Sequence, residues 1–128
     1  MQPLRRLLKR ERKIFMENRI AENVVERLSQ HFIPSYIYTE QSSLPYCVYE
    51  VEQESPIYTK TALSGWKADV TVYLAAATEA ESVEMKDKAL AVLMARDGRY
   101  IYNVSSVQPG YAEEQWLQKI DIQVTQLY

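Results

Sequence analysis

The stretch WKADVTVYLAAATEAESVEMKDKALAVL, residues 66–93, decides the fold, because its hydrophobic period changes from two residues to that of a helix. Apolar and polar side chains alternate over residues 66–76, which is typical of a strand with one buried face. Thr78 and Glu81 then have the spacing of a helix capping box, and Gly98 in the pair Asp-Gly supplies a stop signal. The stretch therefore predicts a half-buried strand followed by a helix of about 17 residues.

The helix expected over residues 79–95 has a wide apolar stripe. Its members are Val83, Met85, Ala89, Leu90, Val92, Leu93 and Met94. Such a stripe favours a helix that lies across a sheet, with its glutamates facing outward.

A second alternating segment, residues 46–53, places Cys47, Tyr49 and Val51 on one face. If it pairs antiparallel with residues 66–76, both apolar faces are buried together only when the numbers of opposite residues add to an odd total, near 119 or 121. A slip by one residue would turn an entire apolar face toward solvent. The pattern therefore predicts this register.

The remaining elements follow from weaker patterns of the same two kinds. Apolar residues at helical spacing indicate an amphipathic helix over residues 10–31, which Pro34 closes. Further strands are expected at residues 35–40, 100–107 and 114–128, with Pro109-Gly110 as the connection between the last two. The order α-β-β-β-α-β-β predicts a single α+β domain over residues 1–128, with an antiparallel or mixed sheet and two helices packed on one face.

Composition restricts the class of protein. With 128 residues, of which 47% are hydrophobic and 25% charged, the chain is typical of one soluble globular domain. No apolar run has the length of an export signal or of the ~18 residues that a membrane span requires, so we expect no membrane partner. The single cysteine cannot form an internal disulfide, which suits a reducing compartment.

The net charge of −2 conceals a basic N-terminal helical arm, residues 1–13, in which six cations stand against one acid. The cations are Arg5, Arg6, Lys9, Arg10, Arg12 and Lys13. The arm is either an exposed helix start or a contact for nucleic acid or for an acidic neighbouring subunit. Because it has no base-reading signature and the rest of the chain is acidic, we expect little or no binding to nucleic acid.

Residue types that perform chemistry are few. His31, the only histidine, falls in the last turn of a predicted helix, where the helix dipole favours a cation, and Cys47 is expected to be buried. Glu50, Glu52 and Glu54 line one strand face and could bind a cation or act as acid and base, although a solvated or subunit-facing strip is the simpler interpretation. The three glycines are isolated, which excludes a phosphate-binding loop. We expect no catalytic residue, no metal and no cofactor.

Within this order of elements, the segments LPYCVYEV (residues 44–51) and VTVYLAAATEAES (residues 70–82) resemble the tail-terminator (tail completion) proteins of long-tailed bacteriophages and prophages, the family that includes minor tail protein U. The resemblance covers about residues 10–128. It implies a structural subunit, not an enzyme, that forms a homohexameric ring, caps the tail tube and offers a joining surface to the head connector. It also implies assembly in the cytoplasm of a bacterial host and a place in the virion tail.

Between the two long strands lies a polar segment without a tight-turn signal, ESPIYTKTALSG, residues 54–65. The resemblance implies that this segment is a projecting interaction loop toward the tail tube protein or a neighbouring subunit, whereas a plain long hairpin connection is the alternative. The candidate contact residues are Ser55, Ile57, Tyr58, Lys60 and Leu63. A second function also stays open, that of a small α+β binding domain that contacts nucleic acid through the basic arm.

Overall fold

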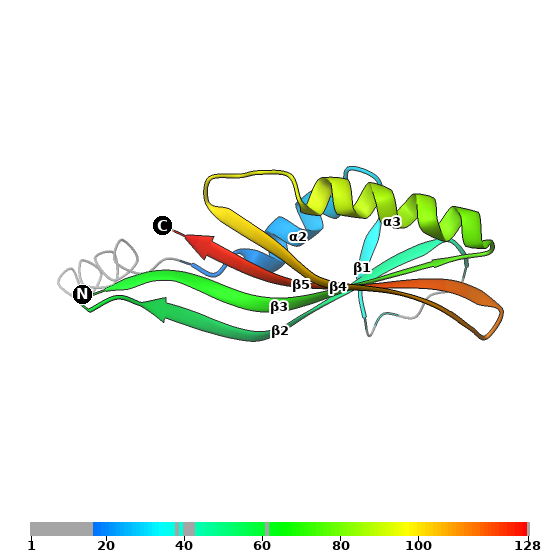
Figure 1. Ribbon diagram of the computed structural model, residues 1–128. Coiled ribbons are helices and arrows are strands. Elements are labelled where there is room, and N and C mark those ends of the chain that lie inside the picture. The colour runs from blue at the N-terminus through cyan, green and yellow to red at the C-terminus, as the bar shows by residue number, and fades with distance from the viewer. Residues whose placement is uncertain (1–16, 38, 40–42, 61, 128) are drawn as a thin grey trace, which may run out of the picture.

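In the computed structural model, described for residues 17–37, 39, 43–60 and 62–127, a five-stranded sheet carries two helices on one of its faces (Figure 1). The elements in chain order are α2 (Ile20–Leu28), β1 (Pro34–Tyr36), β2 (Tyr46–Tyr58), β3 (Leu63–Ala76), α3 (Glu79–Leu93), β4 (Tyr100–Ala112) and β5 (Gln115–Leu127). The predicted α+β class, the element order and the placement of both helices on one face are confirmed.

The strand order in the sheet is β1-β2-β3-β5-β4. β1 is parallel to β2 and every other neighbouring pair is antiparallel, so the sheet is mixed. β2 and β3 place Tyr49 opposite Val72 and Val51 opposite Val70, and the numbers of opposite residues add to 121 along this part of the ladder. This is one of the two registers predicted, and it brings the apolar faces of the two strands together.

The core lies between the sheet and the two helices. Alternation along β3 buries Val70, Val72 and Leu74 on the helix-covered face, as predicted. The same cluster includes Ile20, Val24 and Leu28 of α2, Ala89 and Leu93 of α3, and Ile120, Ile122 and Val124 of β5. Full burial of a side chain of this size contributes about 1.5–3 kcal/mol, so the alternating strands stabilise the fold through this one face.

Helix α3 begins at the predicted capping position. Thr78 is the N-cap, and its hydroxyl oxygen accepts the backbone N–H of Glu81 at 3.2 Å. The helix ends two residues earlier than predicted, and its buried residues are Ser82, Met85, Ala89, Val92 and Leu93. Val83 and Met94, which were expected in the buried stripe, are 37% and 58% exposed. The buried face instead includes small residues, which allow the helix backbone to approach the sheet closely.

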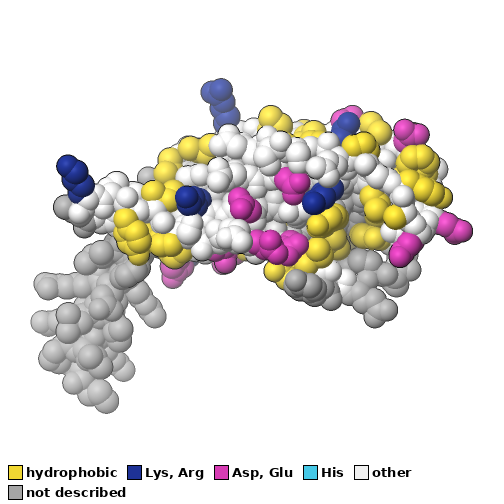
Figure 2. Space-filling view, turned by 60° about the horizontal axis from the view of Figure 1, so that its bottom comes forward, with side chains coloured by type: hydrophobic (Ala, Val, Ile, Leu, Met, Phe, Trp, Pro, Cys, Tyr) yellow, Lys and Arg dark blue, Asp and Glu magenta, His cyan; other side chains and the backbone are white. Residues whose placement is uncertain are grey.

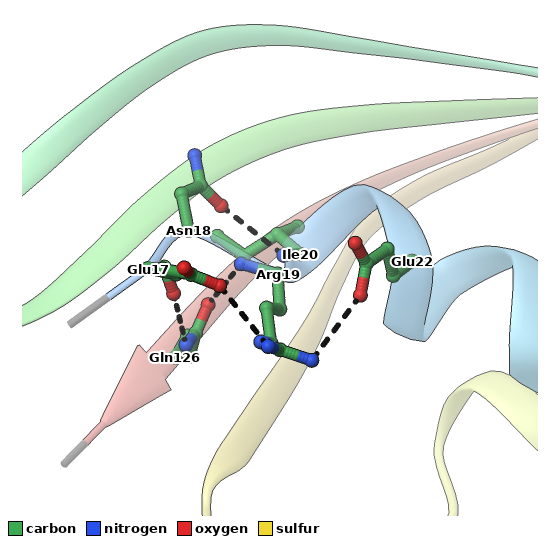
Figure 3. Close-up of polar contacts among 6 residues, drawn as sticks. All are labelled: Glu17, Asn18, Arg19, Ile20, Glu22 and Gln126. Atoms are coloured by element: carbon green, nitrogen blue, oxygen red, sulfur yellow. Dashed lines mark hydrogen bonds and ion pairs between the residues drawn. The ribbon is translucent and has the colours of Figure 1, made fainter. Parts of the chain in front are cut away.

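Helix α2 is shorter than predicted. It begins at Ile20, whereas the sequence indicated a helix from about residue 10; residues 17–19 are not helical, and residues 10–16 lie outside the described part of the chain. Asn18 Oδ1 accepts the backbone N–H of Ile20 at 3.1 Å (Figure 3). This bond occupies one of the N–H groups that a helix start leaves without an intrahelical partner, so it fixes the start at this point.

The turn between β4 and β5 is not where the sequence indicated. Pro109 and Gly110 lie within β4, and the turn falls at Glu113 and Glu114, whose φ angles of 53° and 62° are those of a type I′ turn. The proline is tolerated because β4 is the edge strand and has an unpaired outer side.

Both edges of the sheet are short or irregular. The ladder between β4 and β5 is interrupted between Val104 and Ser106, and Pro109 follows three residues later. At the opposite edge β1 has three residues, fewer than the six predicted, although Ile37 N–H still donates to the carbonyl of Tyr49 at 2.9 Å.

Candidate functional site

The segment expected to be an interaction loop is the outer part of a long β-hairpin. β2 continues to Tyr58 and β3 begins at Leu63, so the turn of the hairpin lies between these two residues. Thr59 donates to the carbonyl of Ala62 from its N–H at 2.9 Å and from Oγ1 at 3.1 Å. The expectation of a long loop was therefore wrong, as was the alternative of a long hairpin connection, because most of this segment belongs to the two strands. The hairpin tip is defined here as Ile57, Tyr58, Thr59, Lys60 and Ala62.

The five candidate contact residues differ in exposure. Tyr58 is 67% exposed, and Lys60 is exposed and forms no ion pair with any described residue. Ser55 and Ile57 are half-buried, and Leu63 is buried with 7% exposure. Tyr58 and Lys60 are thus available to a partner, whereas Leu63 packs inside this chain.

Close backbone packing holds the hairpin against β5. A side chain at Gly65 would collide with the backbone carbonyl of Gln126, so a glycine is required at this position. Ser64 Oγ donates to the carbonyl of Ile57 across the hairpin at 3.1 Å. Further down, Gln53 has a φ of 54° at an irregularity of the ladder, and such bulges increase strand twist and change the direction in which a hairpin points.

Residues 17–19, the first described residues of the chain, are held beside this hairpin by a group of polar contacts (Figure 3). The amide of Gln126, a residue with 5% exposure, accepts the N–H of Arg19 at 2.7 Å and donates to the carbonyl of Glu17 at 2.8 Å. Asn18 Nδ2 donates to Glu54 Oε1 at 2.9 Å. Residues 17–19 are therefore attached to both β5 and β2.

The cations of the predicted basic arm, Arg5, Arg6, Lys9, Arg10, Arg12 and Lys13, lie outside the described residues. The position of Glu17, the first described residue, is nevertheless defined. Gln126, to which Glu17 is bonded, lies opposite Trp66, three residues after the start of β3. Glu17 is thus at the same end of the sheet as the hairpin tip.

A groove of about 630 Å³ lies at the other end of the sheet, between α3 and the β4–β5 hairpin. We call it the α3–β4 groove, and its lining includes Ser82, Val83, Lys86, Val107, Pro109, Tyr111 and Trp116. The rings of Tyr111 and Trp116 are 4.8 Å apart between centroids, and Tyr111 is 59% exposed. Acidic side chains gather at this end (Figure 2), where Glu79, Glu113 and Glu114 are exposed.

Polar side chains occupy the sheet face opposite the helices (Figure 2). The carboxylate of Asp121 accepts hydrogen bonds from Thr71 Oγ1 at 3.0 Å and from Ser106 Oγ at 2.8 Å. One carboxylate thereby joins the side chains of three neighbouring strands. These hydrogen bonds link the strands on the face of the sheet that no helix covers.

The predicted glutamate strip is only partly formed. A hydrogen bond with Glu52, together with some desolvation, raises the pKa of Glu50 above its usual range. Glu54 departs from the strip, because the irregularity at Gln53 breaks the alternation and Glu54 bonds to Asn18. Among the described residues, no group of three His, Cys, Asp or Glu side chains is placed to hold a metal ion.

The two residues considered for nucleophilic chemistry occupy different environments. His31 is exposed and lies beyond the end of α2, not in its last turn as predicted, and its N–H donates to the carbonyl of Leu28 at 3.1 Å. Cys47 is 2% exposed, and burial raises the pKa of its thiol to about 12. The thiol therefore stays protonated near neutral pH and is a poor nucleophile.

Two features were missed by sequence reasoning. Arg27 is buried although its position on α2 gave no sign of it, and its guanidinium donates to the carbonyls of Leu93 and Ala95 at 2.9 and 2.7 Å. The α3–β4 groove was missed because its aromatic walls, Tyr111 and Trp116, flank a turn that the sequence did not locate. The exposed tyrosine directly before Ala-Glu-Glu is the signal that could have indicated it.

No protein-family model matches this chain, and no curated protein matches it. Within the described ranges, no helix is long and apolar enough to cross a membrane. What the chain does must therefore be inferred from its fold and its surfaces.

Proposed function

We propose that the chain is a structural subunit of a phage or prophage tail, which forms a ring that caps the tail tube and provides the surface for joining the head. The proposal starts from the resemblance of residues 44–51 and 70–82 to tail-terminator proteins. The α+β fold and its element order are those that this resemblance implies, which supports the proposal. The expected partners are further copies of the chain, the tail tube protein and the head-completion protein.

The observation that carries the proposal is the hairpin formed by β2 and β3, whose outer part extends past the helices (Figure 1). At its tip Tyr58 is 67% exposed and Lys60 is free of ion pairs with the described residues. Tyrosine is enriched at protein interfaces because its ring can be buried while its hydroxyl keeps a polar partner. A few large side chains of this kind usually supply most of the energy of an interface.

Native mass spectrometry of the purified chain, alone and with purified tail tubes, tests the proposal directly. We expect a multiple of the 14.9 kDa chain, with six copies by family resemblance, in solution or on the tube end. A chain that stays monomeric in both conditions would contradict the proposed function.

Tail assembly in the parent phage or prophage provides the functional test. We expect Tyr58→Ala to give folded protein but tails that are unterminated or not joined to heads, because the contact side chain is lost. Gln123→Ala is the matched control, since Gln123 is also exposed but lies in β5 on the open face of the sheet. Normal infectious particles from Tyr58→Ala would show that Tyr58 at the hairpin tip is not needed for the assembly contact.

A small binding domain that contacts nucleic acid is the second candidate, and it is favoured only by the charge of residues 1–13. We expect weak or no duplex binding at physiological salt, because the rest of the chain is acidic and repels phosphate. Binding with a sub-micromolar Kd that disappears when Arg5, Arg6 and Arg10 are replaced by alanine would favour this second function.

A further inference from the structure

We propose that the α3–β4 groove is the receptor for the hairpin tip of a second copy of the chain, so that the ring closes through head-to-tail contacts between these two sites. This inference rests on the proposed function, because it specifies the contact between ring subunits. It assigns a partner to Tyr58 and Lys60 and a ligand to the groove.

The two sites lie at opposite ends of one chain. The hairpin tip precedes Leu63 at the start of β3, whereas Trp116 in the groove lies opposite Ala76 at the end of β3. Thirteen residue steps along a strand cover about 40 Å, so a chain cannot place its tip in its own groove. Two unlike sites that fit each other from opposite ends form a heterologous contact, which gives a closed ring when the rotation closes.

The chemistry of the two sites is complementary. The groove offers the adjacent rings of Tyr111 and Trp116 and the exposed side chain of Val83, against which the ring of Tyr58 can be buried. Offset or edge-to-face aromatic contacts contribute about 0.5–1.5 kcal/mol beyond the burial of their area.

The charges also match. Glu79, Glu113 and Glu114 are exposed at the groove end, and Lys60 is the exposed cation in the turn of the tip. Lys86, the cation in the groove lining, lies 3.5 Å from the carboxylate of Asp87, so it does not cancel this acidic charge. Attraction between Lys60 and these carboxylates favours the head-to-tail contact, whereas a tip-to-tip contact would bring two Lys60 side chains together.

Disulfide trapping between separate chains tests the contact. One chain carries Lys60→Cys, the other carries Glu113→Cys, and the two are mixed under mild oxidation; the native Cys47 is buried and does not compete. We expect a covalent pair of chains to form roughly tenfold faster than in a matched mixture in which Gln123→Cys replaces Glu113→Cys, because cysteines cross-link only when their Cα atoms come within about 7 Å.

A second measurement does not depend on the geometry of the cross-link. Tyr58→Ala and Tyr111→Ala each remove an exposed ring and should each weaken assembly of the otherwise unmodified chain, as followed by native mass spectrometry. If the rings contact each other across the interface, the two losses of assembly should not add. The double variant should then assemble about as well as either single variant.

The outcomes separate the inference from the function on which it rests. Slow cross-linking together with additive single effects overturns the tip-to-groove contact, while a ring of wild-type chains under the same conditions leaves the proposed function intact. Groove variants that abolish binding to tail tubes but keep the ring would assign the groove to the tube protein and overturn the contact. A wild-type chain that never assembles, alone or on tubes, overturns both.

Discussion

The guanidinium of Arg27 lies over the ring of Tyr102, 4.0 Å from the ring centroid, and only 6% of Arg27 is exposed. The same group donates to the carbonyls of Leu93, the last residue of α3, and of Ala95, two residues further on. Helix C-termini leave carbonyls without intrahelical partners and favour a nearby cation. One side chain of α2 therefore caps α3 and covers a residue of β4.

Replacing Arg27 by methionine should lower the free energy of unfolding by about 2–4 kcal/mol, because the buried carbonyls lose their donors while the apolar stem is kept. Urea denaturation measures the change. Arg96→Met is the control, since Arg96 is exposed and should be replaceable within about 0.5 kcal/mol. Equal effects of the two variants would mean that the capping contact does not stabilise the fold.

Val72→Asp should prevent folding. Val72 is fully buried between Tyr49 and Ile120, and an unpaired carboxylate there costs several kcal/mol against a total stability of about 5–15 kcal/mol. Circular dichroism and thermal unfolding report the result. Asn103→Asp, on the exposed face of the edge strand, adds the same group and should fold normally. A cooperatively folded Val72→Asp chain would mean that the face of the sheet that carries Val72 is not the buried one.

Truncation of two residues of the same hairpin should change stability by very different amounts. Leu63→Ala should cost about 2–3 kcal/mol because it leaves a cavity at a buried site, whereas Tyr58→Ala should change stability by less than about 0.5 kcal/mol. Thermal denaturation distinguishes them. Replacing the whole of residues 55–64 by a short turn should therefore lower stability, because it removes the buried Leu63. A strongly destabilised Tyr58→Ala chain would show that the ring belongs to the core.

Alkaline pH should destabilise the chain through Cys47. Its thiol has a pKa of about 12 in the fold against an ordinary value of 9.0, so the unfolded chain releases a proton that the folded chain keeps, and stability falls as pH rises through this window. Burial raises the pKa of the Tyr102 hydroxyl in the same direction. Thiol reagents at pH 8 should modify native Cys47 much more slowly than unfolded Cys47, because the native thiol is both protonated and buried. Burial also raises the pKa of Tyr100, so Cys47→Ala should retain the part of the alkaline loss that comes from the two tyrosines. An unchanged profile would exclude a contribution from the thiol.

The elements with the strongest periodicity could be predicted from the sequence. β3 and α3 follow from alternation and from the cap at Thr78. Alternation also limits the register of β2 on β3 to odd totals, because a slip by one residue would expose an apolar face. The end of α2 and the extent of β1 depended on local signals and were less accurate. Periodicity constrains which face is buried more strongly than it constrains where an element stops.

The turns and the buried arginine could not be predicted for physical reasons. Pro109-Gly110 has turn composition but lies in an edge strand, where a missing N–H costs little, and the actual turn uses two glutamates with positive φ, an unusual choice. Arg27 is buried because its partners come from α3 and β4, far away in the sequence. The same long-range assembly produces the groove.

Unpaired strand edges invite other chains to add strands, which is how sheet proteins come to aggregate. Here the β4 edge contains a proline and a ladder interruption. The opposite edge consists of three residues of β1 and, beyond them, the outer side of β2, which contains the irregularity at Gln53 and Pro56. Neither edge is a long regular template for a further strand. Copies at high local concentration are thereby hindered from adding strands to one another and forming fibrils, whereas contacts at the ends of the sheet remain possible.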